Sequence, residues 1–203
     1  TKGIWFFVMG LSKKVFIADV IARAINPMFA DCASMGLIQS WVIVLGYTVQ
    51  IYFDFAGYSD MAVGLGHFVG LQMPKNFNSP YKAANISDFW RRWHISLSTW
   101  LRDYLFIPLG GSRRGTYWTL VNLMVVMFLG GMWHGATWGF IVWGLYHGVL
   151  LVSHAIFGKL GGKMWTPLGR ALTFITVVFG WAIFRSADPG LGFGMTRQLV
   201  GSM

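Results

Sequence analysis

The longest uncharged run of the chain lies between Arg114 and Lys159, where 44 consecutive residues include no Lys, Arg, Asp or Glu. A membrane-spanning helix needs about 20 predominantly apolar residues, so this run is long enough for two crossings. Near its middle stands the segment Gly-Gly-Met-Trp-His-Gly, which begins at Gly130 and contains His134. An ionisable residue at such a place is a candidate functional residue.

The composition agrees with a membrane protein, because 55% of the 203 residues are hydrophobic and only 11% are charged. We therefore predict an all-α, polytopic transmembrane helical bundle that forms a single membrane domain over residues 1–203. The first residue is Thr1 rather than Met, and we expect the chain to be an internal fragment with both ends truncated. Further spans are predicted at residues 32–53, 57–71 and 168–184, and a segment at residues 4–28, which contains four charged residues, is expected to lie partly in the interface.

Metal chemistry is disfavoured by the residue types present. The chain has one cysteine, Cys32, which excludes an internal disulfide and a cysteine-based metal cluster. All seven acidic residues are Asp, and they are not spaced with histidines as a metal site requires. We predict no metal site.

The net charge of +9 is concentrated in one stretch between predicted spans. By the positive-inside tendency this stretch is cytoplasmic, and the parity of the predicted crossings brings Lys13, Lys14 and Lys159 to the same side. Its position in a membrane protein argues against a nucleic-acid partner and favours the lipid bilayer and an anionic cytosolic substrate. The stretch contains seven of the sixteen basic residues, namely Lys75, Lys82, Arg91, Arg92, Arg102, Arg113 and Arg114.

Residues 85–104 within this stretch have the periodicity of an amphipathic helix. Asn85 and Asp88 have the spacing of an N-terminal capping box, and Pro108 with the following glycines ends the pattern. We predict an interfacial helix with an aromatic face and a cationic face. The aromatic face would contain Phe89, Trp93, Leu97, Trp100 and Tyr104, and the cationic face Arg91, His94, Ser98 and Arg102.

Several of these features have two interpretations. The aromatic residues are most simply membrane-interface anchors, whereas the arginines are compatible with lipid headgroups or with substrate phosphates. For His147 and His154 we favour hydrogen-bonded packing inside a span. The pattern alone leaves His94 and His134 open between packing and function.

Four motifs follow one another along the sequence. They are Phe-Asp-Phe-Ala-Gly-Tyr-Ser-Asp-Met at residues 53–61, Pro-Lys-Asn-Phe-Asn-Ser-Pro-Tyr at 74–81, the segment at 89–98 with Leu-Arg-Asp-Tyr at 101–104 and Pro-Leu-Gly-Gly at 108–111, and Gly-Gly-Met-Trp-His-Gly at 130–135. Together they resemble the membrane-bound O-acyltransferase family, and most of all its bacterial members that acetylate exported polysaccharides such as alginate. The resemblance extends over residues 3–185 in unbroken order, and members of the family are longer than this chain.

The resemblance implies an integral enzyme of the bacterial inner membrane, with re-entrant segments that line a tunnel. Such an enzyme moves an acyl group from a cytosolic thioester, for which acetyl-CoA is the expected donor, to a polysaccharide hydroxyl or to a periplasmic acetyltransferase subunit. No bound cofactor is expected. The family's invariant histidine corresponds to His134 and the polar residue of its second motif to His94, and we predict that both are catalytic.

The chemistry suits these residues. A neutral imidazole at His134 can accept the proton of the attacking hydroxyl, the Trp133 indole can donate to the developing oxyanion, and His94 would orient a reacting group. The glycines around His134 allow close approach of backbone to substrate. Arg91, Ser98 and Arg102 complete the predicted substrate-binding residues. A covalent acyl-enzyme through Cys32, Ser96 or Ser98 stays open, although no serine and base stand at catalytic spacing.

The depth of His134 poses a difficulty. Counted from Thr116 at 1.5 Å per residue, it lies about 27 Å along a straight helix, near the far interface. The resemblance instead places it deep in a tunnel. A break at Gly130 and Gly131, or a strong tilt, would reconcile the two.

Two other classes of function stay open. A transporter or channel would also place histidines in the membrane, but the 44-residue run contains no acidic or basic residues of the kind that line ion paths. A non-catalytic scaffold for a polysaccharide-modifying complex would tolerate replacement of His134.

Overall fold

The computed structural model describes residues 1–30, 35–186 and 189–201, so Cys32 lies outside the described residues. The described residues form helices and no strands, which confirms the all-α prediction. They divide into two compact units, one of residues 1–78 with 194–203 and the other of residues 79–193. Each unit is described by itself.

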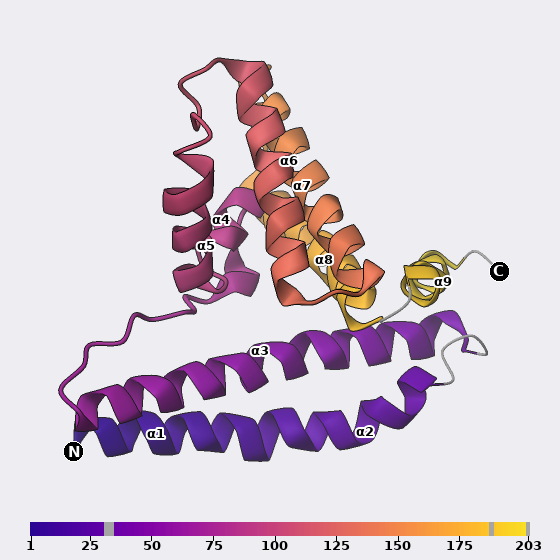
Figure 1. Cartoon of the computed structure of the whole chain (residues 1–203). Helices are drawn as coiled ribbons and strands as arrows, with labels where there is room; N and C mark the ends of the chain where they lie inside the picture. The colour runs from indigo at the N-terminus through magenta and orange to yellow at the C-terminus, as the bar shows by residue number, and fades with distance from the viewer. Residues whose placement is uncertain (31–34, 187–188, 202–203) are drawn as a thin grey trace. The chain divides into compact units, whose positions relative to one another are not determined.

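The first unit is built on one long helix, α3 (Leu37–Phe68). Along it, in the opposite direction, follow α1 (Lys2–Ser12), the π-helix η1 (Lys13–Ala18) and α2 (Asp19–Ala30), as Figure 1 shows. The two predicted spans at 32–53 and 57–71 are therefore wrong, because Gly57 does not interrupt the helix. A Cβ atom on Gly57 would lie 2.6 Å from the carbonyl oxygen of Gly10, so this glycine permits close helix packing instead.

Three of the four charged residues that interrupt the apolar pattern of residues 4–28 form ion pairs. Lys13 Nζ lies 2.5 Å from Asp60 Oδ2, and Lys14 Nζ lies 2.6 Å from Asp54 Oδ1 and 3.0 Å from Asp19 Oδ1. Pairing lowers the cost of placing charge among apolar helices. Since α3 is one helix, the parity argument that brought Lys13 and Lys14 to the side of the basic stretch also fails.

The C-terminal part of α9 (Pro189–Val200) packs on the start of α3 within the same unit. The indole of Trp41 donates a hydrogen bond to the carbonyl of Leu199 over 2.9 Å, and the Ser40 hydroxyl donates to the Gln198 side-chain oxygen over 3.2 Å. These bonds attach the last helix to the first unit.

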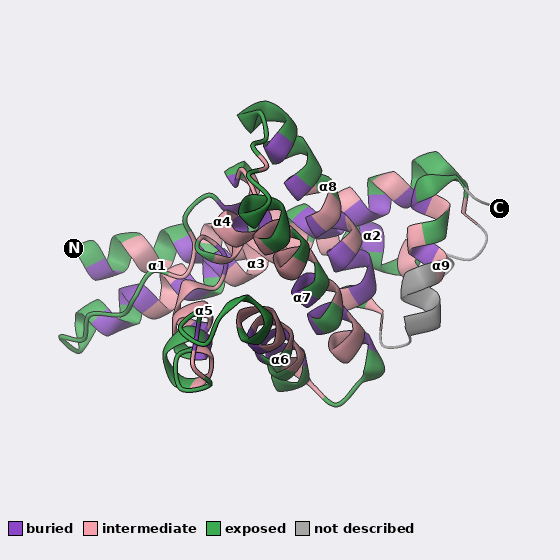
Figure 2. Cartoon of the chain, turned by 90° about the horizontal axis from the view of Figure 1, so that it is seen from above, coloured by how far each residue is buried: buried purple, intermediate pink, exposed green. Residues whose placement is uncertain are grey.

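The second unit contains three helices that are long and apolar enough to cross a membrane. They are α6 (Thr116–His134), α7 (Trp138–Lys159) and α8 (Thr166–Arg185). The first two occupy the uncharged run and confirm its division into two long apolar helices, and α8 matches the span predicted at 168–184. Figure 2 shows buried positions on α8, and its apolar Leu168, Leu172 and Ile175 are exposed, as expected for a helix that meets lipid.

Helices α6 and α7 form an antiparallel hairpin with close backbone contact. A Cβ atom on Gly131 would lie 2.4 Å from the Phe140 carbonyl oxygen, and one on Gly144 would lie 2.4 Å from that of Met127. Of the two alternatives for the depth of His134, a break at Gly130 and Gly131 does not occur, because α6 continues to His134. Both glycines are buried, so they serve helix packing and not the backbone approach to substrate that we expected of them.

The segment at 85–104 is not one helix, which corrects the amphipathic prediction. It forms α4 (Ile86–Trp90), α5 (Ile95–Leu101) and the start of the π-helix η4 (Arg102–Phe106), preceded by the 3-10 turn η3 (Pro80–Lys82). The chain bends between α4 and α5, and His94 there has a φ of 44°. Phe89 and Trp93 are 1% and 4% exposed, so the prediction that they anchor the interface is wrong, whereas Trp100 and Tyr104 are exposed.

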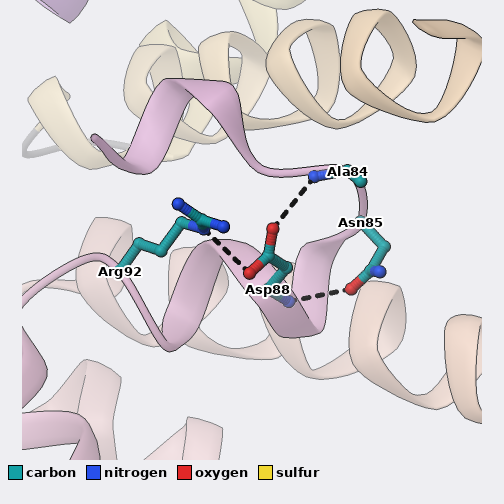
Figure 3. Close-up of polar contacts among 4 residues, drawn as sticks. All are labelled: Ala84, Asn85, Asp88 and Arg92. Carbon is teal, nitrogen blue, oxygen red and sulfur yellow. Dashed lines mark hydrogen bonds and ion pairs between the residues drawn. The ribbon is translucent and has the colours of Figure 1, made fainter. Parts of the chain in front are cut away.

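Figure 3 shows how α4 begins. The Asn85 side-chain oxygen accepts a hydrogen bond from the Asp88 N–H over 2.8 Å, as the capping pattern predicted. The Asp88 carboxylate accepts from the Ala84 N–H over 3.2 Å and from Arg92 Nε over 2.8 Å. Burial raises the pKa of Asp88, but the bonds from Arg92 and Ala84 outweigh this effect and lower it overall. Arg92 therefore helps to fix the start of α4.

Candidate active site

His134 is the last residue of α6, and its ring orientation is fixed by its own helix. Its Nδ1 lies 2.7 Å from the carbonyl oxygen of Gly130. A carbonyl only accepts hydrogen bonds, so in the neutral imidazole Nδ1 carries the proton and Nε2 has the lone pair. The half-buried ring can therefore accept a proton at Nε2.

Aromatic rings surround His134. The centroid of its ring lies 5.0 Å from that of Trp133, 5.1 Å from Trp143 and 5.4 Å from Phe184. These residues come from α6, α7 and α8, so the site depends on the packing of all three apolar helices. Such surroundings exclude bulk water from one side of the imidazole.

His94 reaches the same site from the bend between α4 and α5. Its ring centroid is 6.0 Å from that of Trp133, which also packs on His134. Burial, with the neighbouring His134 as a further cause, lowers the pKa of His94 to about 4. The positive φ of His94 places the ring there, since a helix continuing through residues 91–94 would carry it elsewhere. The structure thus brings together His94, Trp133 and His134, whose roles stay predictions.

The other three predicted substrate-binding residues line a single cavity. Arg91, Ser98 and Arg102 face a cavity of about 550 Å³ whose opposite wall is apolar and includes Val126 and Leu151. A cavity of this size, with a few polar groups among apolar ones, is typical of small-molecule sites. His94, Trp133 and His134 are not among its lining residues.

Aromatic contacts connect this cavity with His134. Trp90 lines the cavity, and its ring centroid lies 5.7 Å from that of Trp143. Trp143 in turn packs on His134 at 5.1 Å. The cavity and the histidine are therefore neighbours in one packed unit.

The charges at the cavity differ between the two arginines. Arg102 Nε lies 2.7 Å from Asp103 Oδ1, so its charge is partly compensated. Arg91 is also exposed, and its charge contributes to the lowered pKa of Asp88. The positive charge of Arg91 is thus less compensated than that of Arg102.

The structure shows the contacts of two of the three candidate nucleophiles for a covalent acyl-enzyme. The Ser98 hydroxyl donates to the Trp93 carbonyl over 3.2 Å, which occupies its proton. Ser96 Oγ lies 3.5 Å from His94 Nδ1, a pairing of serine and base that the sequence analysis missed. Two residues that are two positions apart can contact each other where the chain bends. The helical and strand periods of the sequence do not predict such a contact. Cys32 lies outside the described residues.

Within residues 1–30, 35–186 and 189–201 no group of three His, Cys, Asp or Glu side chains could hold a metal ion.

His147 differs from its predicted state. It is completely buried within α7, and among the described residues neither of its ring nitrogens has a hydrogen-bond partner. The prediction of packing holds, but the prediction of hydrogen bonding is wrong. His154, one heptad further along α7, is partly exposed and lines a separate cavity of about 470 Å³.

These features define an all-α membrane protein with two histidines in an aromatic site next to a cavity with cationic residues. The model of the membrane-bound O-acyltransferase family matches residues 1–188, and the chain belongs to this family.

Several curated relatives resemble the chain closely. It is 48% identical over 200 residues to "Probable alginate O-acetylase AlgI" of Pseudomonas aeruginosa, covering 98% of this chain and 38% of the relative. It is 44% identical over 203 residues to the peptidoglycan O-acetyltransferase of Helicobacter pylori, with coverage of 98% and 38%. It is 37% identical over 195 residues to the teichoic acid D-alanyltransferase of Bacillus subtilis, with coverage of 84% and 49%. The chain therefore spans less than half the length of these relatives.

Proposed function

We propose that the protein is part of a multi-pass O-acyltransferase of the bacterial inner membrane. It transfers an acetyl group from a cytosolic thioester, acetyl-CoA, towards hydroxyls of an exported polysaccharide such as alginate. Family membership and the names of the relatives support acyl transfer to cell-surface polymers. The observation that carries the proposal is the 2.7 Å contact between His134 Nδ1 and the Gly130 carbonyl oxygen, which leaves Nε2 as the proton acceptor of a ring that shares Trp133 with His94.

The reaction needs no nucleophile from the protein. The acceptor oxygen attacks the thioester carbonyl while its proton passes to Nε2 of His134. The Trp133 indole donates to the oxyanion, the carbon–sulfur bond then breaks, and the imidazolium returns the proton to the departing thiolate. His94, kept neutral above its lowered pKa, orients a reacting group without adding positive charge.

The donor enters past the cavity lined by Arg91 and Arg102. Guanidinium groups suit the phosphates of acetyl-CoA because they present a planar set of donors. The surplus of basic residues between Lys75 and Arg114 favours a cytoplasmic position for this entrance. The acceptor is the polysaccharide itself or a periplasmic acetyltransferase subunit that passes the acetyl group on.

The test uses the full-length protein in inverted membrane vesicles with labelled acetyl-CoA and candidate acceptors. We expect His134→Ala to reduce transfer by on the order of 10² to 10⁴, the usual contribution of general-base catalysis. His154→Ala, a histidine outside the site, is the matched control and should transfer at the wild-type rate. A His134→Ala protein that is normally inserted and keeps more than a tenth of the activity would favour the scaffold function instead.

A further inference from the structure

A second buried polar cluster lies deeper in the same unit than His134. Within the described residues, both ring nitrogens of His147 and the indole nitrogens of Trp90, Trp143 and Trp181 are buried and have no hydrogen-bond partner. These four side chains come from α4, α7 and α8. Buried polar groups in native proteins nearly always have partners, so four of them together indicate a common function.

The four side chains are neighbours. The ring centroid of His147 lies 4.9 Å from that of Trp143 and 5.2 Å from that of Trp90. Trp143 packs on Trp181 with centroids 6.1 Å apart. The unpaired groups thus belong to one cluster around His147.

The hydrogen-bond donors and acceptors of the four side chains determine which kind of group could bind to them. An indole nitrogen only donates, so Trp90, Trp143 and Trp181 offer three donors, while the neutral imidazole offers one donor and one acceptor. Such a set fits an oxygen atom with lone pairs, either a water molecule or an amide carbonyl oxygen of the acyl donor. A cation would not be accommodated, because the three indole N–H groups only donate.

Gly180 on α8 leaves space for the imidazole ring of His147. A Cβ atom at Gly180 would lie 2.8 Å from His147 Nε2, so the glycine on α8 makes room for this edge of the ring. Trp90 of α4 packs on the same ring, with centroids 5.2 Å apart. The position of His147 is therefore fixed by packing on two helices.

The cluster touches both parts of the proposed site. Trp90 lines the cavity with Arg91 and Ser98, and Trp143 packs on His134. Any shift of His147 reaches the cavity wall through Trp90 and the catalytic imidazole through Trp143. This placement distinguishes His147 from a histidine that only fills space.

We propose that His147 is a positioning residue for acyl transfer: with the indole N–H groups of Trp90 and Trp143 it binds an oxygen atom that accepts their hydrogen bonds, and so holds Trp143 against His134. The inference rests on the proposed function, because it concerns the rate of that reaction. His147 does not touch the reacting atoms. It acts through Trp143.

The experiment compares three variants of the full-length enzyme in vesicles. His147→Phe keeps a ring and removes both nitrogens, His147→Gln restores a donor and an acceptor, and Trp143→Phe removes one indole N–H. We expect His147→Phe to lower kcat by on the order of 10-fold to 100-fold through misplacement of His134. We expect His147→Gln to recover a large part of that loss. His154→Phe on the same helix is the control and should stay within about twofold of wild type, the range of a surface substitution.

The dependence on donor concentration identifies the oxygen. A fall in kcat at unchanged donor KM indicates a bound water, whereas a rise in donor KM indicates an oxygen of the donor, and either result supports the site. The proposal is overturned if inserted His147→Phe keeps the wild-type kcat and KM, or if the Phe and Gln variants lose activity equally. A wild-type rate for Trp143→Phe also overturns it, even where the His147 variants fail to insert.

Failure of this inference is separable from failure of the proposed function. If the wild-type enzyme transfers acetyl and the His147 and Trp143 variants do so equally well, only the positioning role is lost. If the wild-type enzyme transfers nothing to any acceptor, the proposed function is lost and the positioning role with it.

Discussion

Two antiparallel helix pairs in this chain pack closely through glycines, but they differ in the polar residues that they carry. In the first unit α1 lies against α3 through Gly10 and Gly57, and in the second α6 lies against α7 through Gly131 and Gly144. In each pair a Cβ atom would meet a backbone carbonyl oxygen at 2.4 to 2.6 Å. Close backbone approach of this kind is the usual function of small residues between membrane helices.

The two pairs differ in their polar residues. The first continues into a network of ion pairs that involves Lys13, Lys14, Asp54 and Asp60. The second has no Lys, Arg, Asp or Glu before Lys159, and its titratable residues include His134 and His147 among aromatic rings. Paired charges hold helices together, whereas a neutral imidazole can exchange a proton. Under the proposed function, the acyl-transfer chemistry therefore belongs to α6 and α7, and the first pair contributes stability.

The largest expected effect comes from widening each helix pair. Gly131→Ala forces a Cβ atom towards the Phe140 carbonyl, and Gly10→Ala does the same towards the Gly57 carbonyl. We expect both to destabilise by about 1–3 kcal/mol through overpacking. Only Gly131→Ala should also lower the transfer rate per inserted molecule more than about tenfold, because it moves the end of α6 that carries His134.

Melting temperature and acetyl transfer should be measured on the same samples. Gly158→Ala is the control, because nothing lies within 4 Å of a Cβ atom there. Equal loss of transfer in the Gly10 and Gly131 variants would contradict the proposal that α6 and α7 carry the acyl-transfer chemistry and that α1 and α3 do not.

The ion pairs of the first unit are expected to contribute unequally. Asp60→Asn leaves Lys13 without the carboxylate at 2.5 Å, whereas Asp54→Asn leaves Lys14 its contact with Asp19. We expect Asp60→Asn to destabilise by on the order of 1 kcal/mol and Asp54→Asn by less, since these partly exposed pairs are of modest strength. Thermal unfolding in detergent measures the difference. A greater loss in Asp54→Asn would show that the network is not as the distances indicate.

A smaller effect concerns the arginines at the cavity. Replacing Arg91 or Arg102 by Gln should raise the donor KM more than it lowers kcat. We expect a rise of about twofold to fivefold for Arg91→Gln, as for a partly exposed charge contact. The rise should be smaller for Arg102→Gln because Asp103 already compensates Arg102.

Salt gives an independent check on these arginines. Added salt should weaken donor affinity in the wild type and less so in the variants. Wild-type donor dependence in both variants would assign these arginines to the lipid surface.

A further prediction concerns the pH dependence that His94 adds to stability. Its pKa is about 4 in the folded protein and near 6.5 in an unfolded chain. Between these values the unfolded chain binds a proton that the folded protein does not, so the free energy of unfolding falls as pH drops from about 7 to 4.

His94→Gln removes this contribution, and its melting temperature should fall less between pH 7 and pH 5 than that of the wild type. His67→Gln is the matched control, because His67 lies in the first unit, outside the site. Identical pH slopes for wild type and His94→Gln would show that His94 is not held neutral.

Several features were predictable because they depend on properties of the local sequence. The uncharged run gave two apolar helices, since hydropathy and length decide whether a helix can cross a bilayer. The Asn85 cap was also predictable, because a short polar side chain satisfies the N–H of a residue three positions later. The resemblance pointed to His134 and His94 and the charge pattern to Arg91 and Arg102, and the functional roles of these four residues stay predictions.

The roles of the glycines, the bend at His94 and the contacts between distant residues depend on the tertiary structure. A glycine in an apolar segment can end a helix or let another helix approach, and only the partner helices made Gly57, Gly130 and Gly131 packing residues. The bend at His94 overrides the helical period, because burial of Phe89 on one side of the bend and Leu97 on the other is worth more than continuing the helix. The pairing of Lys13 and Lys14 with carboxylates and the unpaired nitrogens of His147 depend on residues distant in sequence. Sequence periodicity reports one helix at a time, whereas these properties belong to helices in contact.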